Sequence, residues 1–322
     1  MMTKSVGIIG ANGYTGSELV RLLAFHPKVE LQFLYSRSNA GIKISDIYPD
    51  LISVCEMTLT NKTEEVDILF LCLPHQESKN WLTENPVKEN VLVIDLGNDF
   101  RLESNFQDRN FIYGLPEIFK NGLKSAKSIA NPGCFATAIQ LALLPLAKDN
   151  LLKDIYTTGI TGSTGAGQSL QSTTHFSWRN DNISVYKTLT HQHVDEVLKS
   201  LNQFNEKEIE LNFVPWRGDF VRGIFTSSTI KCDLDLNEIQ EKYCDFYKDA
   251  SFVTFSEKPI DLKQVINTNR CAIHIEKNND TVVVHSAIDN LLKGASGQAV
   301  QNMNIAMNWD ENLGLDLKPL AF

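Results

Sequence analysis

The chain has 322 residues, 43% of them hydrophobic and 21% charged, which is typical of a globular protein long enough for two domains. Its net charge of −9 argues against a nucleic-acid binder, because no basic cluster is available to neutralise a row of phosphates. The six cysteines include no Cys-x-x-Cys pair, so neither a zinc site nor a disulfide framework is expected, and no metal is predicted. The absence of a signal-peptide pattern and of an apolar run of about 18 residues predicts a cytoplasmic protein.

The chain opens with the order of elements that a dinucleotide-binding unit needs. Residues 6–9 are predicted to form a buried strand, residues 10–16 a glycine-rich turn and residues 17–25 an amphipathic helix. The glycines follow the spacing Gly-x-x-Gly-x-x-Gly rather than Gly-x-Gly-x-x-Gly. A turn of this kind lets the backbone approach a pyrophosphate, which the first N–H groups of the helix then bind.

The end of the second predicted strand, residues 29–35, bears on the choice between NAD and NADP. An Asp or Glu at this point accepts a hydrogen bond from the ribose 2′-hydroxyl of NAD. This chain has Ser36, Arg37 and Ser38 instead. Arg37 can pair with the 2′-phosphate of NADP, although a solvated loop arginine is the alternative. The missing acid favours NADP.

Two further apolar runs, residues 66–73 and 91–96, are predicted to be parallel strands buried on both faces. Polar residues just beyond the carboxyl ends of such strands line the ligand crevice of the sheet. His75 and Arg101 are therefore candidate ligand contacts, with an exposed loop position as the alternative for each. Cys72 is expected to pack within its strand.

The candidate nucleophile is Cys134, which follows Asn131-Pro132-Gly133. The residue before a proline is disfavoured in a helix, and a helix over residues 135–148 is predicted to begin at once after the turn. The thiol then lies at or near a helix N-terminus, where free N–H groups and the helix dipole favour an anion. The thiolate is the nucleophilic form of cysteine. A small buried cysteine that fills a gap is the alternative.

A strand over residues 155–160 leads into a loop of small residues, 161–168, which offers backbone donors for a wall of the site. After a long polar loop, His191 and His193 precede a predicted helix over residues 194–204. The pair lacks the further ligands that a metal requires. A histidine that carries a proton beside the thiol fits better, and two surface histidines are the alternative.

The remainder of the chain predicts an antiparallel sheet with a crossing helix. The expected elements are a strand over residues 221–231, a helix over 236–248, a hairpin of 270–276 with 281–288, and a last helix that opens at Asp289 and runs to Met307. Open sheets of this kind supply walls for substrates and surfaces for subunits.

Several separate stretches together resemble the semialdehyde dehydrogenase family, and within it the N-acetyl-gamma-glutamyl-phosphate reductases. The stretches are Gly10-Ala11-Asn12-Gly13-Tyr14-Thr15-Gly16, Leu73-Pro74-His75, Asp99-Phe100-Arg101, Tyr113-Gly114-Leu115-Pro116-Glu117, Asn131-Pro132-Gly133-Cys134, His191-Gln192-His193 and Asp289-Asn290-Leu291-Leu292-Lys293-Gly294. Each is weak alone, but in this order they are highly specific.

The resemblance implies an α/β fold: a Rossmann-like NADP-binding domain made of residues 1–133 with 290–322, and an α+β domain over 134–289 with an antiparallel-rich sheet. This second domain would hold the substrate and join the subunits of a homo-oligomer, a dimer or a tetramer. The implied reaction is the NADPH-dependent reduction of N-acetyl-gamma-glutamyl phosphate to N-acetylglutamate 5-semialdehyde, with release of phosphate, in arginine biosynthesis. It would pass through a thioester on Cys134.

The same resemblance implies the roles of individual residues. Cys134 matches the nucleophile and His191 the acid–base, with His193 left open for that role. The expected cofactor contacts are Gly10, Asn12, Gly13, Tyr14, Thr15, Gly16, Ser36, Arg37, Ser38, Pro74, Asn290 and Lys293. The expected substrate contacts are Arg101, Asn131, Gly162, His193, Arg217 and Arg222.

One segment departs from the family pattern Val-Pro-x-x-Arg-Gly. Here residues 214–223 contain extra residues and two Arg-Gly pairs, so either Arg217 or Arg222 can hold the substrate. Trp216 and the longer loop leave open an N-succinyl rather than an N-acetyl substrate. Two other functions also stay open, an aspartate-semialdehyde dehydrogenase and a non-enzymatic NADP-binding regulator.

Overall fold

The computed structural model describes residues 3–320, which form two compact units. The first unit contains the chain up to Gly133 together with Ala295–Asp316. The second contains Cys134–Gly294 together with the segment that begins at Leu317. The boundary between the two units lies after Gly294, so residues 290–294 belong to the second unit. The boundary expected from the sequence lay before residue 290. Among residues 3–320, no helix has both the length and the apolar character needed to cross a membrane.

The first unit is built on a six-stranded parallel sheet with the strand order β2-β1-β3-β4-β8-β7. Its strands are β1 (Lys4–Ile9), β2 (Val29–Tyr35), β3 (Ile68–Leu71), β4 (Leu92–Asp95), β7 (Ile112–Tyr113) and β8 (Ser128–Ala130). A separate small hairpin joins β5 (Asn105–Phe106) to β6 (Arg109–Asn110). The strand order reverses at β1, and ligands bind such sheets beyond the carboxyl ends of the strands at this switch point. The expected Rossmann-like arrangement is confirmed.

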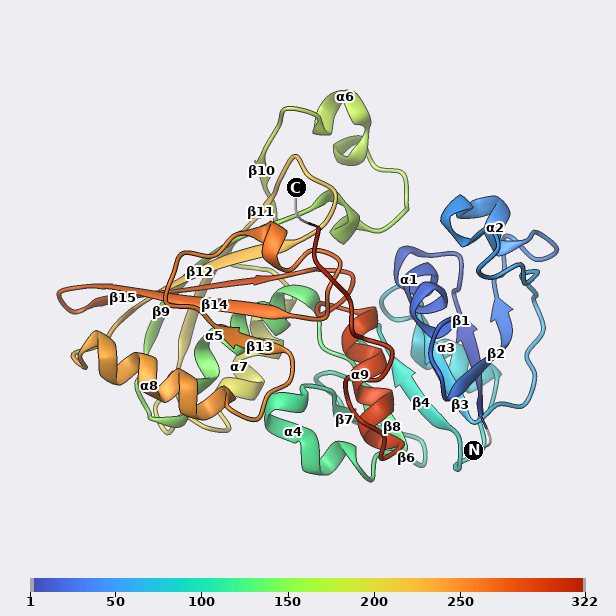
Figure 1. Ribbon diagram of the computed structural model, residues 1–322, viewed down its shortest axis with the longest axis horizontal. Helices are drawn as coiled ribbons and strands as arrows, with labels where there is room; N and C mark the ends of the chain where they lie inside the picture. Colours follow the sequence, from blue (N-terminus) through green and yellow to red (C-terminus); the bar gives the residue numbers. More distant parts are fainter. Residues whose placement is uncertain (1–2, 321–322) are drawn as a thin grey trace. The chain divides into compact units, whose positions relative to one another are not determined.

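The helices of the first unit are α1 (Tyr14–Leu23), α2 (Ile44–Ile47), α3 (Glu77–Glu84), α4 (Pro116–Leu123) and α9 (Ser296–Ala306). The apolar side chains of α1 are buried, and α1 contacts α9, which returns to this unit from the far end of the chain (Figure 1). The core between helices and sheet contains fully buried Phe70 and Ile8. α1 begins at Tyr14 rather than at Ser17, so the glycine turn passes directly into the helix.

The second unit is built on a seven-stranded mixed sheet with the order β10-β11-β9-β12-β15-β14-β13. Its strands are β9 (Asp154–Thr161), β10 (Ser184–Val185), β11 (Glu210–Arg217), β12 (Ile224–Lys231), β13 (Val253–Phe255), β14 (Cys271–Asn278) and β15 (Thr281–Ile288). Most neighbouring strands are antiparallel, as expected, but β9 pairs in parallel with β11, and β13 with β14. A helix lies between β9 and β11 in the chain, and such a crossover brings two strands together in parallel.

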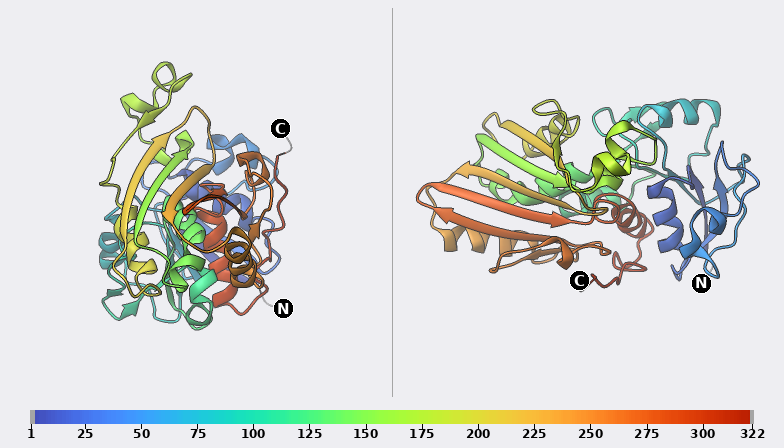
Figure 2. Two further views of the ribbon diagram at one scale, coloured as in Figure 1. Left: turned by 90° about the vertical axis from the view of Figure 1, so that its left-hand side faces the viewer. Right: turned by 90° about the horizontal axis from the view of Figure 1, so that it is seen from above.

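Helices α5 (Cys134–Lys148), α7 (His193–Leu201) and α8 (Leu236–Tyr247) pack together with this sheet, and α6 (Phe176–Arg179) lies in a loop before β10. Figure 2 shows the long strands side by side, with α8 along one face. α5 is buried on nearly all sides, which explains its continuous apolar sequence. The other face of the sheet carries partly exposed side chains, among them Tyr156 at 62% exposure.

The last helix starts later than the sequence predicts. α9 begins at Ser296 and not at Asp289. Asp289 instead holds a turn, because its Oδ1 accepts hydrogen bonds from the N–H groups of Leu291 and Leu292 and its carbonyl accepts one from Gly294. A short polar side chain that bonds nearby N–H groups competes with helix formation in this way.

Candidate functional site

The glycine turn after β1 is shaped by close backbone contacts at the switch point of the first sheet. Gly10 has φ +80°, and a Cβ there would lie 2.3 Å from the carbonyl oxygen of Cys72. A Cβ at Gly16 would lie 2.4 Å from the Gly10 carbonyl oxygen. Neither position accepts a side chain. α1 then begins behind Gly13, which offers no capping side chain, so the first N–H groups of the helix suit the pyrophosphate of a dinucleotide.

The glycine turn and the segment after β2 lie side by side, as a shared cofactor site requires. Asn12 Nδ2 donates to Asn39 Oδ1 at 3.2 Å, and Ser38 Oγ donates to the same oxygen at 2.7 Å. Ser36 Oγ accepts from the N–H of Asn39, which fixes the turn. Tyr48 Oη donates to the Asn12 carbonyl at 2.9 Å. The structure thus brings together two of the segments predicted to contact the cofactor.

Arg37 lies among carboxylates that the sequence did not reveal. Its guanidinium is 4.0 Å from Glu77 Oε2 and 3.8 Å from Glu84 Oε2, both on α3. The Arg37 side chain is 59% exposed, so these contacts are loose and solvated. The expectation that no acid lies at this point holds only for the local sequence, because α3 supplies two from a distant segment.

Two titratable groups at the carboxyl ends of the strands are shifted by burial. Burial raises the pKa of the Cys72 thiol to about 12, against a hydrogen bond with Thr15. Cys72 lies directly after β3 rather than within it and is only half-buried, so the prediction that it packs in the strand holds in part; its N–H bonds to the Ile9 carbonyl of β1. Burial also raises the pKa of Asp95 to about 6, against hydrogen bonds from Ser78 and Gly97. Pro74, predicted to contact the cofactor, is exposed on the loop after β3.

Arg101 and Asn131, both predicted to contact substrate, are buried and bonded to the protein. Arg101 donates from Nε to the Asn131 carbonyl at 2.9 Å and from Nη2 to the Leu96 carbonyl at 3.0 Å. Asn131 Nδ2 donates to the Ala295 carbonyl at 3.1 Å, and its Oδ1 accepts from Asn302 at 3.0 Å. These bonds fix the turn that precedes Cys134 in the chain.

The candidate nucleophile is the first residue of α5 and packs closely on the Asp289 turn. A Cβ added at Gly294 would lie 2.8 Å from Cys134 Cβ. The turn is tied to two other loops of the second unit through Asn290, which accepts from the Gly223 N–H at 2.7 Å and donates to Thr164 Oγ1 at 3.0 Å. The Cys134 side chain therefore packs on the Asp289 turn, which hydrogen bonds join to the loops that contain Gly223 and Thr164.

Two more predicted site residues lie in these hydrogen-bonded loops. A Cβ at Gly162 would lie 2.5 Å from the Val221 carbonyl oxygen, so glycine is required there by packing. Lys293 is fully buried, with its Nζ 5.9 Å from the centroid of the Phe252 ring.

The two candidate arginines have different surroundings. Arg222 donates from Nε to Asp289 Oδ2 at 3.1 Å and from Nη2 to Oδ1 at 3.2 Å, and the Asp289 side chain is fully buried. Arg217 lies with its guanidinium carbon 4.7 Å from the centroid of Tyr186. Arg222 is thus neutralised by a carboxylate within the fold, whereas the Arg217 guanidinium lies on an aromatic face.

The histidine pair is buried at the start of α7. His191 is 7% exposed and His193 6%. The N–H of His193 donates to His191 Nδ1 at 3.2 Å, which places the proton of a neutral His191 on Nε2. The His191 ring lies edge-on to Phe135, the neighbour of Cys134 in the chain, with 5.8 Å between centroids.

Tyr186 is a member of the site that sequence reasoning missed, because it lies in a polar stretch outside any predicted element. Its ring centroid is 5.7 Å from that of His191. Burial raises the pKa of its hydroxyl, and the charge of a Cys134 thiolate raises it further, whereas Arg217 opposes both effects. Tyr186 is therefore the common neighbour of the thiol, the histidine and Arg217.

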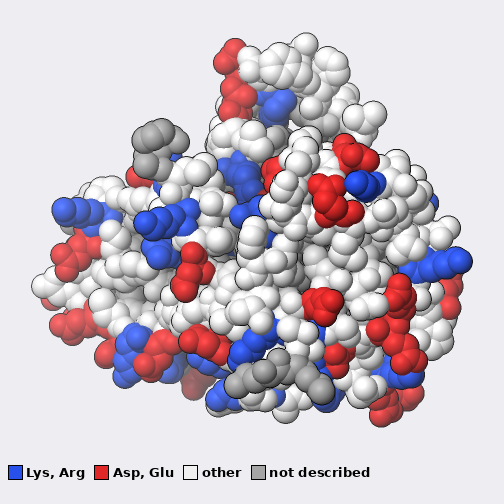
Figure 3. Space-filling view, turned by 45° about the vertical axis from the view of Figure 1, so that its right-hand side comes forward, with Lys and Arg blue, Asp and Glu red and all other residues white. Residues whose placement is uncertain are grey.

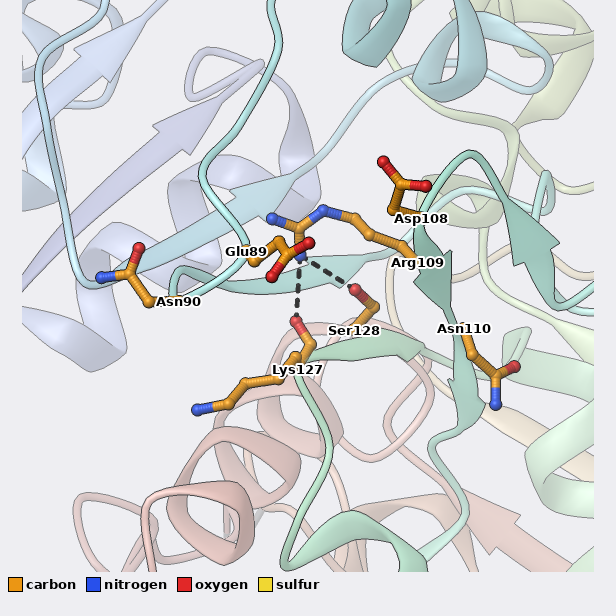
Figure 4. Close-up of a pocket in the computed structure, with 7 residues that line it drawn as sticks. All are labelled: Glu89, Asn90, Asp108, Arg109, Asn110, Lys127 and Ser128. Atoms are coloured by element: carbon orange, nitrogen blue, oxygen red, sulfur yellow. Dashed lines mark hydrogen bonds between the residues drawn. The ribbon is translucent and has the colours of Figure 1, made fainter.

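A separate hollow in the first unit does not belong to this site. It is lined by Glu89, Asn90, Asp108, Arg109, Asn110, Lys127 and Ser128 (Figure 4). Arg109 fills its centre and donates to the Lys127 carbonyl and to Ser128 Oγ, among other acceptors. Residues 127 and 128 lie at the amino-terminal end of β8, opposite the end at which parallel sheets bind ligands.

Comparisons with known proteins agree with this arrangement. Residues 5–126 match the NAD binding domain of semialdehyde dehydrogenases, and residues 134–290 match their dimerisation domain. A protein from Phocaeicola vulgatus named N-acetyl-gamma-glutamyl-phosphate reductase is 51% identical over 98% of this chain and 99% of its own. A protein of the same name from Flavobacterium johnsoniae is 51% identical over 99% of each chain.

Solved structures show the same fold at low identity. Aspartate semialdehyde dehydrogenase II from Vibrio cholerae superposes with a TM-score of 0.75 at 16% identity, over 96% of this chain and 99% of that one. Aspartate semialdehyde dehydrogenase from Candida albicans gives a TM-score of 0.68 at 16% identity, over 97% and 99%. With both domains matched and half of its residues shared with named relatives, this chain belongs to the semialdehyde dehydrogenase family, a family of oxidoreductases that use a nicotinamide dinucleotide.

Proposed function

We propose that the protein reduces N-acetyl-gamma-glutamyl phosphate to N-acetylglutamate 5-semialdehyde with NADPH, a step of arginine biosynthesis. The observation that carries the proposal is the position of Cys134 as the first residue of α5, packed on the Asp289–Gly294 turn and flanked by Tyr186. The relatives at 51% identity that bear the reductase name favour this substrate over aspartyl phosphate. The 16% identity to aspartate semialdehyde dehydrogenases supports the fold alone.

The proposed reaction starts with attack of the Cys134 thiolate on the acyl carbon of the substrate. A C–S bond forms, the C–O bond to phosphate breaks, and a thioester is left on the enzyme. The first N–H groups of α5 are the natural donors to the oxyanion, each worth about 3 kcal/mol. The bound cofactor supplies the hydride that reduces the thioester carbon. His191 gives a proton to the oxyanion that hydride addition leaves on the hemithioacetal, and takes it back as the C–S bond breaks and the aldehyde forms.

The choice of NADP rests on Ser36, Arg37 and Ser38 beside the glycine turn. The loose contacts of Arg37 with Glu77 and Glu84 can be exchanged for a bidentate pair with a 2′-phosphate. We expect Arg37→Met to raise KM for NADP at least about tenfold and to leave KM for NAD nearly unchanged, because a charge-assisted pair is lost only with NADP. Steady-state kinetics with both cofactors test this, and an equal effect on the two would remove Arg37 from the cofactor site. We further propose that Asn290 and Lys293 contact the nicotinamide side.

We also propose that the protein is a homo-oligomer that associates through the outward face of the second sheet. Tyr156 on β9 is 62% exposed there, and the Trp216 indole donates to Thr158 Oγ1 at 2.9 Å on the same face. The match to a dimerisation domain covers this sheet. Light scattering should give a mass above that of one chain, and Tyr156→Glu should lower it.

One assay tests the proposed reaction in the reverse direction. NADPH formation from N-acetylglutamate 5-semialdehyde is followed with phosphate or arsenate, in the wild type, Cys134→Ser and Cys244→Ser. Cys244 is an exposed cysteine on α8 and serves as the matched control. We expect Cys134→Ser to lose nearly all activity with cofactor binding intact, and Cys244→Ser to retain it. A silent wild type, with the N-succinyl substrate as well, or an active Cys134→Ser would refute the proposal.

The same assay decides between the two histidines. Removing the acid–base should cost about 10²–10⁴-fold in rate. We expect this loss in His191→Asn, since Nδ1 of His191 accepts a backbone hydrogen bond and Nε2 is left to serve the reaction. If His193→Asn proves the more damaging change, the role moves to His193.

A further inference from the structure

Arg179 and Arg217 form a pair of like charges in the second unit, in which Arg179 is buried and Arg217 is partly exposed. On the face shown in Figure 3, basic and acidic side chains are interspersed. In contrast, neither of these two arginines has a carboxylate oxygen within 4.0 Å among the residues the structure describes. Asp219 is the acid that acts on Arg179, and it is exposed and accepts a hydrogen bond from the Asp181 N–H.

Arg179 is buried and hydrogen-bonded although it lies in a surface loop. It ends α6, which stands off the end of the sheet in Figure 1, and is only 7% exposed although Phe176 in the same helix is 77% exposed. Its Nη1 donates to the Arg217 carbonyl at 3.1 Å and its Nη2 to Ser184 Oγ at 3.2 Å. These bonds hold its guanidinium against the backbone of Arg217. Burial, and after it the charge of Arg217, lowers the pKa of Arg179.

Both guanidinium groups keep unused hydrogen-bonding capacity. The Nε–H groups of Arg179 and Arg217 are buried, and neither has an acceptor among the described residues. A buried donor without a partner costs free energy, and two adjacent cations add their repulsion. An anion that accepts from both forks removes both costs, which is the usual reason for such an arrangement.

The contact of the pair with Tyr186, a neighbour of Cys134, bears on which anion the pair binds. The phosphate that leaves during the reaction is attached to the carbon that Cys134 attacks, so it lies directly at the thiol. The Arg217 guanidinium carbon lies 4.7 Å from the centroid of Tyr186, and Tyr186 is near enough to Cys134 for the thiolate charge to raise its pKa. Arg179 in turn donates to the Arg217 carbonyl. A carboxylate remote from the reacting carbon therefore suits the pair better than the leaving phosphate, and KM for phosphate tests this choice.

We propose that Arg179 and Arg217 form a carboxylate-binding subsite for the acyl phosphate substrate of Cys134. The proposal rests on the proposed function for the identity of the substrate. Two carboxylates meet the description: the α-carboxylate of every N-acylglutamate, and a carboxylate at the end of a dicarboxylic N-acyl chain such as N-succinyl. Both present the same chemistry to the two forks.

The test compares Arg179→Gln, Arg217→Gln and the control Arg270→Gln, which removes the charge of an exposed arginine of the same unit. KM is measured for N-acetyl- and N-succinylglutamate 5-semialdehyde and for phosphate. We expect both subsite variants to raise KM for the semialdehyde by about tenfold to a hundredfold, the effect of a lost charge-assisted hydrogen bond, with a smaller change in kcat and none in KM for phosphate. An equal rise for both semialdehydes assigns the α-carboxylate, and a rise for the N-succinyl substrate alone assigns the acyl carboxylate.

A binding measurement separates this proposal from the proposed function. The affinities of N-acetylglutamate and N-succinylglutamate are measured by calorimetry, which requires no turnover. We expect weaker binding of at least one of them to both variants and partial recovery in Arg179→Lys, which keeps the charge but not the fork. A variant that only loosens α6 would unfold at lower temperature without this selective loss. Unchanged KM and affinity in both variants, or a raised KM for phosphate instead, would overturn the subsite.

Discussion

The ion pair between Arg222 and Asp289 offers a direct test of which candidate arginine serves the fold. In Arg222→Gln the carboxylate of Asp289 remains fully buried and keeps its hydrogen bonds from the N–H groups of Leu291, Leu292 and Asn267, but it loses its counter-charge. Breaking a buried pair from one side typically costs about 3–5 kcal/mol. The three remaining donors and the 22% exposure of Arg222 place the expected loss near the lower end, about 3 kcal/mol.

The assay is urea unfolding of the wild type, Arg222→Gln, Asp289→Asn and the double variant, with Arg270→Gln as an exposed control. We expect Arg222→Gln to lower the midpoint clearly, and the double variant to be less destabilised than the two single changes added together, with a coupling of about 1–3 kcal/mol. The control should stay within about 0.5 kcal/mol of the wild type. A loss of less than about 1 kcal/mol in Arg222→Gln would show that the pair is solvated, and the reasoning that assigns Arg222 to the fold would fail.

Two further predictions concern the first unit. Gly10→Ala should abolish dinucleotide binding, measured by fluorescence titration, because the new Cβ would lie 2.3 Å from the Cys72 carbonyl oxygen; Gly41→Ala, also at positive φ (+92°) but with no atom within 4 Å, should bind normally. Asp95→Asn should remove a pH dependence of stability: since burial raises the pKa of Asp95 to about 6, the wild type loses about 2.5 kcal/mol of unfolding free energy as the pH rises from 4 to 8, and the variant does not. A stability difference between variant and wild type that stays constant with pH would contradict the second prediction, and equal binding by the two alanine variants the first.

The sequence predicted those parts of the fold that local pattern determines. The second strand was placed at residues 29–35, where β2 lies, because its apolar residues and flanking breakers are local signals. The sequence did not predict β11, because Pro215 and polar residues interrupt its apolar pattern. The strand forms because its backbone pairs in parallel with β9, which is a distant segment of the chain. The predicted start of the last helix was wrong because the Asp289 turn depends on hydrogen bonds to residues 222, 223 and 164, which lie far away in the chain.

The candidate site divides in the same way. Cys134 and the glycine turn carry their own signals, a proline-glycine turn before a helix and a strand before glycines. Tyr186 and Arg179 carry none, because their relevance comes only from the neighbours that the folded chain provides. The same holds for Glu77 and Glu84, which reach Arg37 from α3 and alter the charge around a residue that looked isolated in sequence.

The burial of the cysteines also has a consequence for chemical labelling. Cys55, Cys232 and Cys271 are buried, so an alkylating reagent reaches them poorly. Burial raises the pKa of Cys72 to about 12, so this thiol presents little thiolate at neutral pH. Cys244 is exposed on α8, and Cys134 is partly exposed at the start of α5. Replacing Cys244 with serine therefore leaves a protein in which a maleimide or iodoacetamide tag reports chiefly on Cys134, and the rate of tagging becomes a direct measure of substrate occupancy.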